Sequence, residues 1–219
     1  MSSSSLAYKF PRAVLAVFAK QPVLGSVKTR LVPQLGEEGA LAIHKQLIEY
    51  TVGNCQQARL CPLQIWVAHN EPAGPFDSVF LNMADKRSLY YQQGEGLGQR
   101  MAFTVKQALE EAESVVLIGA DCPSVDADYI EQALTGLEDG AEVVVGPAED
   151  GGYVLLGLRR FIPQLFEDIA WGTDQVLAQT RVKLGAEGVR WLELDAKWDV
   201  DRPEDLERLS TLRPSFNEV

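Results

Sequence analysis

The sequence has few of the residues on which disulfide frameworks, thiolate metal sites and histidine-based catalysis depend. Its 219 residues include three cysteines and two histidines. Cys55, Cys61 and Cys122 have neither the spacing of a zinc site nor the even number of a disulfide framework, which favours a reducing, cytoplasmic environment. His44 and His69 show no partner pattern, so a catalytic triad built on histidine is disfavoured.

Long apolar stretches and targeting signals are also missing. The longest apolar runs, such as residues 13–19, are far shorter than the roughly 20 residues that a membrane helix needs. The first residues lack the charged region of a signal peptide. We therefore expect a soluble, cytoplasmic protein with no membrane partner. Residues 1–10 are expected to form a flexible tail and residues 11–219 a single domain, because a chain of this length can bury a core.

Acidic residues are absent from one part of the chain. The first 36 residues contain five basic residues and no acidic residue, whereas the rest contains 15 basic and 31 acidic residues. This asymmetry indicates an anionic partner for the basic segment. The net charge of −11 argues against nucleic acid as that partner, because duplex binding needs a broad basic face. A small phosphorylated molecule is the better candidate.

Short apolar runs alternate along the chain with longer amphipathic segments. Strands are predicted at residues 13–19, 63–68, 114–119, 141–145, 153–158 and 190–194, and helices at residues 37–55, 97–112, 126–137, 173–184 and 203–212. This alternation predicts an α/β fold with a mostly parallel sheet and helices on both faces. Ligands bind such sheets at the carboxyl ends of the strands, so polar residues that directly follow a strand are the candidates for a site.

A basic segment follows the first predicted strand. Residues 20–30 carry Lys20, Lys28 and Arg30, with Gly25 shaping a turn. Backbone amides freed by glycine, the point charge of lysine and the fork of arginine together match a phosphate chain. The segment is neither a Walker A motif nor a dinucleotide-binding glycine fingerprint. We interpret it as a phosphate-binding loop, and the alternative is a solvated basic loop without a ligand.

Two aspartates are candidate ligands for a divalent cation that bridges phosphates. Asp121 directly follows a predicted strand, and Asp201 precedes the last predicted helix. Asp199 is the alternative to Asp201, and we slightly favour Asp201 as the second ligand. A structural explanation stays open for each of these acids: Asp121 or Ser124 would cap the helix that follows, and the later acids would mark the start of the last helix.

The turn at residues 146–153 links two apolar strands and carries two acids beside two glycines. Glu149 and Asp150 are followed by Gly151 and Gly152, at which the backbone is approachable. This combination suits a pocket for an acceptor substrate, with Asp150 or Glu149 as general base. A plain hairpin turn is the alternative.

Three further features are weaker candidates. A glycine-rich turn opens the helix predicted at residues 97–112 and offers backbone to a nucleobase or ribose through Gly96, Leu97 and Gly98. Tyr153 and Trp171 are candidate walls of the acceptor pocket, although a tryptophan in the core is equally consistent with the sequence. Thr173 is predicted to be the N-cap of the next helix. Cys122 is interpreted as a packing residue, because no histidine lies near it.

Residues 18–31, 119–123 and 146–157 together resemble the motifs of one bacterial family. It is the group assigned as glycosyltransferases associated with radical-SAM and selenodomain proteins, also labelled arsenosugar-biosynthesis-type glycosyltransferases. Residues 94–101, 171–173 and 199–206 fit its later motifs, so the resemblance covers nearly the whole chain in order. Gly172 replaces the serine of the family's Trp-Ser-Thr motif, which weakens any role for a hydroxyl at this position.

The resemblance implies the GT-A, or nucleotide-diphospho-sugar transferase, fold, a three-layer α/β/α arrangement with a mixed, mostly parallel sheet. Residues 199–206 are also similar to a segment of sugar cytidylyltransferases, and this similarity implies that Asp201 would hold magnesium. We therefore expect Mg²⁺ or Mn²⁺ as the cofactor. The loop at residues 20–31 is in addition similar to that of 2-phospho-lactate guanylyltransferases. Under either resemblance the partners are a nucleotide or nucleotide-sugar donor and a small-molecule acceptor.

Three functions are therefore predicted, in order of preference. The first is a metal-dependent glycosyltransferase acting on a nucleotide sugar. The second is a nucleotidyltransferase that attacks the α-phosphate of a nucleoside triphosphate, which the three cations of residues 20–30 favour. The third is a non-catalytic nucleotide-binding protein. In both enzymes Lys20, Lys28 and Arg30 would neutralise the leaving group. The base, sugar, acceptor and oligomeric state stay open.

Overall fold

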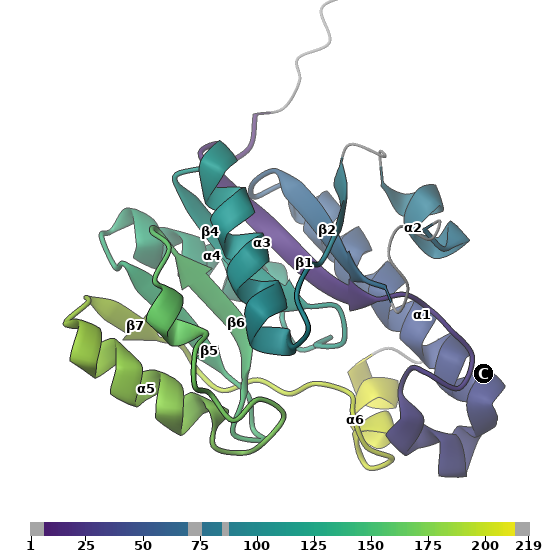
Figure 1. Ribbon diagram of the computed structural model, residues 1–219. Helices are drawn as coiled ribbons and strands as arrows, with labels where there is room; N and C mark the ends of the chain where they lie inside the picture. Colours follow the sequence, from purple (N-terminus) through teal and green to yellow (C-terminus); the bar gives the residue numbers. More distant parts are fainter. Residues whose placement is uncertain (1–6, 70–75, 85–87, 213–219) are drawn as a thin grey trace, which may run out of the picture.

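The computed structural model describes residues 7–69, 76–84 and 88–212, which build one sheet with helices on both faces (Figure 1). The strands are β1 (Ala13–Lys20), β2 (Leu63–Ala68), β3 (Leu89–Tyr91), β4 (Ser114–Gly119), β5 (Val143–Pro147), β6 (Tyr153–Leu158) and β7 (Trp191–Glu193). The helices are α1 (Val32–Ala58), α2 (Ser78–Met83), α3 (Leu97–Glu111), α4 (Ala127–Glu138), α5 (Val176–Glu187) and α6 (Asp205–Leu212), with 3₁₀ turns η1 (Thr29–Leu31) and η3 (Pro163–Leu165).

The strands are ordered β3-β2-β1-β4-β6-β5-β7 across the sheet. β6 is antiparallel to β4 and β5, whereas the other pairings of the described strands are parallel. β5 and β6 form a hairpin joined by residues 148–152. The parallel strands therefore end at a common edge of the sheet. This confirms the predicted three-layer fold with a mixed, mostly parallel sheet.

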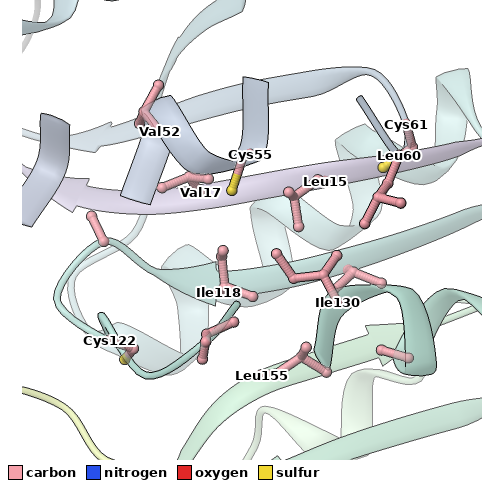
Figure 2. Packing of buried hydrophobic residues seen from close by; sticks show 14 of the residues in the cluster. Leu15, Val17, Val52, Cys55, Leu60, Cys61, Ile118, Cys122, Ile130 and Leu155 are labelled. Atoms are coloured by element: carbon pink, nitrogen blue, oxygen red, sulfur yellow. The ribbon is translucent and has the colours of Figure 1, made fainter. Parts of the chain in front are cut away.

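Two apolar clusters attach the helices to the sheet. On one face α1, α2 and α4 pack over side chains such as Val17, Ile118 and Leu155. Figure 2 shows these three side chains beside Val52 of α1 and Ile130 of α4. On the other face α3 and α5 pack over Leu117 and Leu156. Neighbouring residues of a strand point to opposite faces, so a strand covered on both sides has to be apolar throughout. This explains the continuous apolar runs in the sequence.

The three cysteines are free and lie in the apolar interior. Figure 2 shows Cys55, Cys61 and Cys122 among the aliphatic side chains of the larger cluster. Burial raises the pKa of Cys55 and of Cys61 to about 12. Both thiols are therefore neutral near pH 7 and act as small apolar side chains.

Several elements begin elsewhere than the sequence predicts. α1 begins at Val32 rather than at residue 37, and Gly36, with φ 71°, interrupts its helical path. α5 begins at Val176 with Gln175, not Thr173, at its N-cap position. The hydroxyl of Thr173 donates to the backbone oxygen of Ala170 at 2.7 Å and accepts the N–H of Gln175 at 3.3 Å. The prediction of Thr173 as an N-cap is therefore wrong. β3 and α2, which are short, were not predicted.

α6 also starts later than expected. The sequence places Pro203 in its first turn, but the helix begins at Asp205. The carboxylate of Asp205 accepts the backbone N–H groups of Asp201 at 2.9 Å and Arg202 at 2.7 Å. These bonds hold the chain ahead of the helix in a turn. The segment before α6 therefore has a defined conformation, which matters for the site.

The N-terminal end of the described chain is packed. Phe10, which the sequence assigns to the flexible tail, is 3% exposed, and its N–H donates to the backbone oxygen of Leu60 at 2.7 Å. The packed chain thus begins before residue 11, and residues 1–6 of the predicted tail lie outside the described residues. Within the described ranges, none of the helices combines the length and apolar character of a membrane span.

Candidate active site

A cavity of about 720 Å³ opens at the edge of the sheet where β1, β2 and β4 end. Ligands of open α/β sheets bind at this edge. Predicted site residues that line it are Lys20, Lys28, Arg30, Gly96, Leu97, Asp121, Asp150, Gly152, Tyr153, Trp171 and Asp201. Four other predicted residues are not among the described residues that line the cavity: Gly25, Gly98, Glu149 and Gly151.

The β1–α1 loop turns Lys28 inward. Gly25, with φ 71°, shapes the turn, Val27 is buried, and Lys28 has a left-handed backbone with φ 47° and ψ 42°. The Lys28 side chain is 7% exposed, and its Nζ donates to Asp121 Oδ2 at 2.8 Å and to the backbone oxygen of Val200 at 2.6 Å. A positive φ is uncommon outside glycine and persists where the surroundings enforce it. One ammonium thus joins three distant segments.

Lys28 and Asp121 keep each other ionised. Burial favours the neutral amine, but the charge and hydrogen bond of Asp121 outweigh burial and raise the pKa of Lys28. Burial likewise favours a protonated Asp121, but the charge and hydrogen bond of Lys28 lower its pKa below the usual value. The Asp121 side chain is still 42% exposed. Its carboxylate therefore meets Lys28 and also faces the cavity.

Asp199 and Asp201 flank Val200, whose N–H donates to the backbone oxygen of Asp121 at 3.0 Å. Burial, and next the charge of Asp121, raise the pKa of Asp199 to about 6. Asp201 instead forms an ion pair with Arg30. The pKa of Asp199 thus depends in part on Asp121, whereas the sequence favoured Asp201 as the second metal ligand. Both aspartates line the cavity.

The loop after β4 is fixed by bonds other than those that the sequence suggested. Ser124 Oγ accepts the backbone N–H of Trp198 at 3.0 Å and donates to the backbone oxygen of the same residue. Asp126 caps α4, because its carboxylate accepts the N–H of Tyr129 at 2.8 Å. The alternative interpretation of Asp121 or Ser124 as the helix cap is therefore wrong.

The β5–β6 turn places one acid in the cavity and one outside it. Asp150 lines the cavity, and its Oδ1 accepts the N–H of Gly152 at 2.9 Å. Glu149 accepts two hydrogen bonds from the guanidinium of Arg208, at 2.8 and 3.0 Å. This hydrogen-bonded pairing lowers the pKa of Glu149. The structure therefore separates the two acids that the sequence assigned together to the acceptor site.

Gly98 and Gly151 allow close packing and do not line the cavity. A Cβ on Gly151, whose φ is 90°, would lie 2.4 Å from the backbone oxygen of Asp174. A Cβ on Gly98 would lie 2.3 Å from Trp171 Nε1. Trp171 thus rests on the first turn of α3, with its ring edge-on to Tyr153 and the centroids 6.2 Å apart. These two rings form an aromatic wall of the cavity.

Arg100 and Gln92 are polar residues of the cavity that the sequence prediction missed, as it also missed Ser26, Thr29 and Glu95. Arg100, in the first turn of α3, lines the cavity while its Nε donates to the backbone oxygen of Gly94 at 3.0 Å. Gln92 follows β3, and its amide donates to the backbone oxygens of Ala19 at 3.2 Å and Trp66 at 2.9 Å. A basic residue after the glycine-rich turn was a signal for Arg100. The sequence gave no such signal for Gln92, because the strand that precedes it, β3, was not predicted.

His44 and Cys122 also line the cavity, and neither is charged near pH 7. His44 Nε2 lies 3.0 Å from the backbone oxygen of Lys20. Burial, aided by the charge of Lys28, lowers the pKa of His44. Burial, with a contribution from Asp121, raises the pKa of Cys122 well above its usual value. A neutral thiol is a poor nucleophile, which agrees with the interpretation of Cys122 as a packing residue.

The strand order and the cavity at the sheet edge define the class of fold, that of nucleotide-diphospho-sugar transferases. A crystal structure from Desulfovibrio desulfuricans G20, described as a "putative nucleotide-diphospho-sugar transferase", covers 95% of this chain and 91% of its own, with 28% identity and a TM-score of 0.83. The structure of CMP:2-keto-3-deoxy-manno-octonic acid synthetase complexed with CTP matches 93% of this chain and 99% of its own chain, with 15% identity and a TM-score of 0.59. The structure of the inositol-1-phosphate CTP transferase from T. maritima matches 95% of this chain and 97% of its own chain, with 13% identity and a TM-score of 0.55.

The chain belongs to the family described as "Uncharacterized protein conserved in bacteria (DUF2064)", whose model matches residues 51–173. A comparison with curated protein sequences finds no match. Two of the solved structures above are described as transferases and one as a synthetase, and at 15% and 13% identity the last two show the fold alone. The association with radical-SAM proteins stays a prediction.

Proposed function

We propose that this protein transfers a nucleotidyl group from a nucleoside triphosphate to a small-molecule acceptor. The observation that carries the proposal is the convergence of four cations on one cavity. They are Lys20, Lys28, Arg30 and Arg100. A triphosphate carries more negative charge than the diphosphate of a nucleotide sugar, and clustered lysines and arginines suit it better. Two structures of the same fold are described as a synthetase complexed with CTP and as a CTP transferase, which supports this choice.

The proposed role of the cations is to neutralise the charge that develops on the leaving pyrophosphate. Lys28 is held by Asp121 and Val200 before any ligand arrives, so its position costs no reorganisation during the reaction. One such preorganised donor typically contributes about 2.7–4 kcal/mol to transition-state stabilisation. Arg30 and Arg100 use part of their donor sets for Asp201 and Gly94. A guanidinium has five N–H donors, so both retain groups for phosphate oxygens.

Asp121 and Asp199 are the proposed ligands of Mg²⁺ or Mn²⁺. Magnesium is commonly held by one or two carboxylates and completed by substrate phosphates. The described residues contain no group of three or more side chains that would hold a metal without the substrate. Burial, and next the negative charge of Asp121, raise the pKa of Asp199, and a bound cation would offset the charge of Asp121. We therefore propose Asp199 in place of Asp201. The bound metal would supply Lewis-acid polarisation of the donor phosphates.

In the proposed reaction a hydroxyl oxygen of the acceptor attacks the α-phosphorus. The new oxygen–phosphorus bond forms as the bond from the α-phosphorus to the bridging oxygen breaks, and pyrophosphate leaves. Asp150 is the proposed general base for the hydroxyl proton, because it lines the cavity. Glu149, the other candidate, is engaged by Arg208 outside the cavity.

Glycosyl transfer from a nucleotide sugar is the second candidate. It is favoured by the Desulfovibrio desulfuricans structure, which is 28% identical over 95% of this chain and whose description names nucleotide-diphospho-sugar transfer. The bond that breaks would then join the sugar to the phosphate, and the leaving group would be a nucleoside diphosphate. The same cations would neutralise it.

One experiment separates the two reactions. The protein is incubated with each nucleoside triphosphate or nucleotide sugar and a mixture of small hydroxyl compounds, with and without Mg²⁺, and the products are identified by mass spectrometry. Pyrophosphate release together with a nucleotidylated acceptor is the expected result. Release of a nucleoside diphosphate together with a glycosylated acceptor would replace nucleotidyl transfer by glycosyl transfer. Binding of nucleotides without any product would overturn both.

A further inference from the structure

The lysines and arginines of the cavity lie in one part of it, to which Glu95 and Asp121 also contribute. The lysines and arginines that line it come from the end of β1, the β1–α1 loop and the first turn of α3. We call the residues that line the cavity within residues 148–154, 171–176 and 199–201 the acceptor side. Among the described residues, the acceptor side contains Asp150, Asp199 and Asp201 but no lysine or arginine.

Arginines close to the acceptor side are already paired with carboxylates. Arg208 donates to both carboxylate oxygens of Glu149, the residue before Asp150. Arg30 is paired with Asp201. Arg208 is thus engaged by Glu149, and the remaining N–H groups of Arg30 are assigned to the phosphates of the donor. A phosphate or carboxylate of the acceptor that lies beside Asp150 would therefore meet a negative charge, and like charges in such proximity repel. Because Asp201 is paired with Arg30 and Asp199 is a proposed metal ligand, Asp150 is the carboxylate of the acceptor side that disfavours an anionic group.

Aromatic side chains form a second wall of the acceptor side, next to its carboxylates. Tyr153 and Trp171 stand edge-on, and the hydroxyl of Tyr153 has the sulfur of Met101 as its neighbour at 3.9 Å. The tight contact with Gly98 fixes the Trp171 ring against α3. A rigid aromatic wall favours a ligand with a flat or ring-shaped face, and beside carboxylates it also favours a cationic group.

We propose that the acceptor carries no negative charge: it is a hydroxyl-bearing molecule, neutral or amine-bearing, with a ring that packs against Tyr153 and Trp171. The inference rests on the proposed function, because it describes the second substrate of the same cavity. It sets this protein apart from two structures of the same fold, whose descriptions name an octonic acid and inositol-1-phosphate, both anions.

Three probes that share one ring and one hydroxyl test the proposal. They are tyramine, tyrosol and 4-hydroxyphenylacetate, which carry a positive, a neutral and a negative side chain. Binding of each probe to the full chain is measured by saturation-transfer NMR, with CTP and GTP binding measured separately by calorimetry. Asp150→Asn removes the acid that lines the cavity. Glu149→Gln is the matched control, because it removes one negative charge from the adjacent residue outside the cavity.

The expected result is that tyramine and tyrosol bind at least about tenfold more tightly than 4-hydroxyphenylacetate, a ratio that corresponds to about 1.4 kcal/mol. Asp150→Asn should reduce the ratio of tyramine to 4-hydroxyphenylacetate affinity severalfold, and Glu149→Gln should leave it unchanged. Equal binding of the acid, failure of both tyramine and tyrosol to bind, or equal effects of the two variants would overturn the proposal. Failure to bind nucleotide would overturn the proposed function instead, while the charge preference is still measured on the nucleotide-free protein.

Discussion

The ammonium of Lys28 lies 2.8 Å from a carboxylate oxygen of Asp121, although 93 positions separate the two residues in the chain. The same ammonium donates to the backbone oxygen of Val200 at 2.6 Å. These contacts join the β1–α1 loop, the end of β4 and the segment before α6. Lys28 therefore has a structural role in addition to its proposed contact with donor phosphates.

Replacing Lys28 should cost stability as well as nucleotide binding. Lys28→Met leaves Asp121 partly buried without its partner, and we expect the free energy of unfolding to fall by about 1–3 kcal/mol. Urea denaturation measures this loss. Asp121→Asn in the Lys28→Met background should restore part of it, because the unpaired charge is then gone. Strictly additive losses in this double-mutant cycle would show that the pair is not coupled.

Asp199 should make stability fall as pH rises. Its pKa of about 6 in the folded protein exceeds the ordinary value of 3.8, so the folded state binds more protons between these values. The free energy of unfolding should therefore decrease from about pH 4 to pH 6, by on the order of 2 kcal/mol after allowance for solvent screening. In Asp199→Asn this decrease should be smaller, and the variant should be more stable than the wild type at pH 7. If the free energy of unfolding of the wild type and of the variant changed in parallel with pH, the raised pKa of Asp199 would be contradicted.

A divalent cation should remove the pH dependence that Asp199 causes. If Asp121 and Asp199 bind Mg²⁺ together with a nucleotide, the cation favours the ionised form and lowers the pKa of Asp199. Urea denaturation in the presence of Mg²⁺ and CTP or GTP should then give nearly parallel pH profiles for the wild type and Asp199→Asn. Persistence of the full difference at saturating nucleotide would remove Asp199 from the proposed metal site.

Asp121 should be essential for turnover whichever transfer reaction occurs. We expect Asp121→Ala to lower kcat at least about hundredfold, the scale on which loss of one preorganised charge-stabilising group acts. Asp126→Asn is a suitable control, since Asp126 caps α4 and is not among the described residues that line the cavity. Because asparagine caps helices about as well as aspartate, that variant should keep both its stability and its kcat. Unchanged turnover in Asp121→Ala would rule out the proposed role of this carboxylate.

The strands that build the centre of the fold were predictable because their residues are buried on both faces. β1, β4 and β6 appear in the sequence as continuous apolar runs, and polar residues that follow β1 and β4 do line the cavity. β3 was not predictable in the same way, because three residues are too short to show a period. Gln92, which follows β3, was missed for this reason.

The choice between Asp199 and Asp201 depended on a conformation that the sequence does not specify. Bonds from Asp205 and Ser124 fix the segment before α6, and these bonds join residues on different elements. Glu149 and Asp150 illustrate the same limit, because adjacent acids in a turn point in different directions. The partner of Glu149, Arg208, is 59 positions away. Residue type and spacing thus selected residues that line one cavity, whereas the side-chain directions came from tertiary contacts.

Gly98 should control the acceptor side of the cavity through Trp171. A Cβ at this position would lie 2.3 Å from Trp171 Nε1, so Gly98→Ala has to displace the ring. We expect a loss of about 1–3 kcal/mol in the free energy of unfolding, as for other overpacked contacts. The KM for the acceptor should rise while the affinity for the nucleotide stays unchanged, because the phosphate-binding cations lie on other residues.

Gly185→Ala is the matched control for this substitution. Gly185 lies in α5, and a Cβ there would meet no other atom within 4 Å. Since alanine is the better helix former, this variant should gain up to about 1 kcal/mol in stability and keep both substrate constants. Urea denaturation, calorimetry with nucleotide and steady-state kinetics compare the two variants. If Gly98→Ala were as stable as Gly185→Ala and had an unchanged acceptor KM, the Trp171 ring would not be fixed by α3, and the rigid wall of the acceptor side would have to be abandoned.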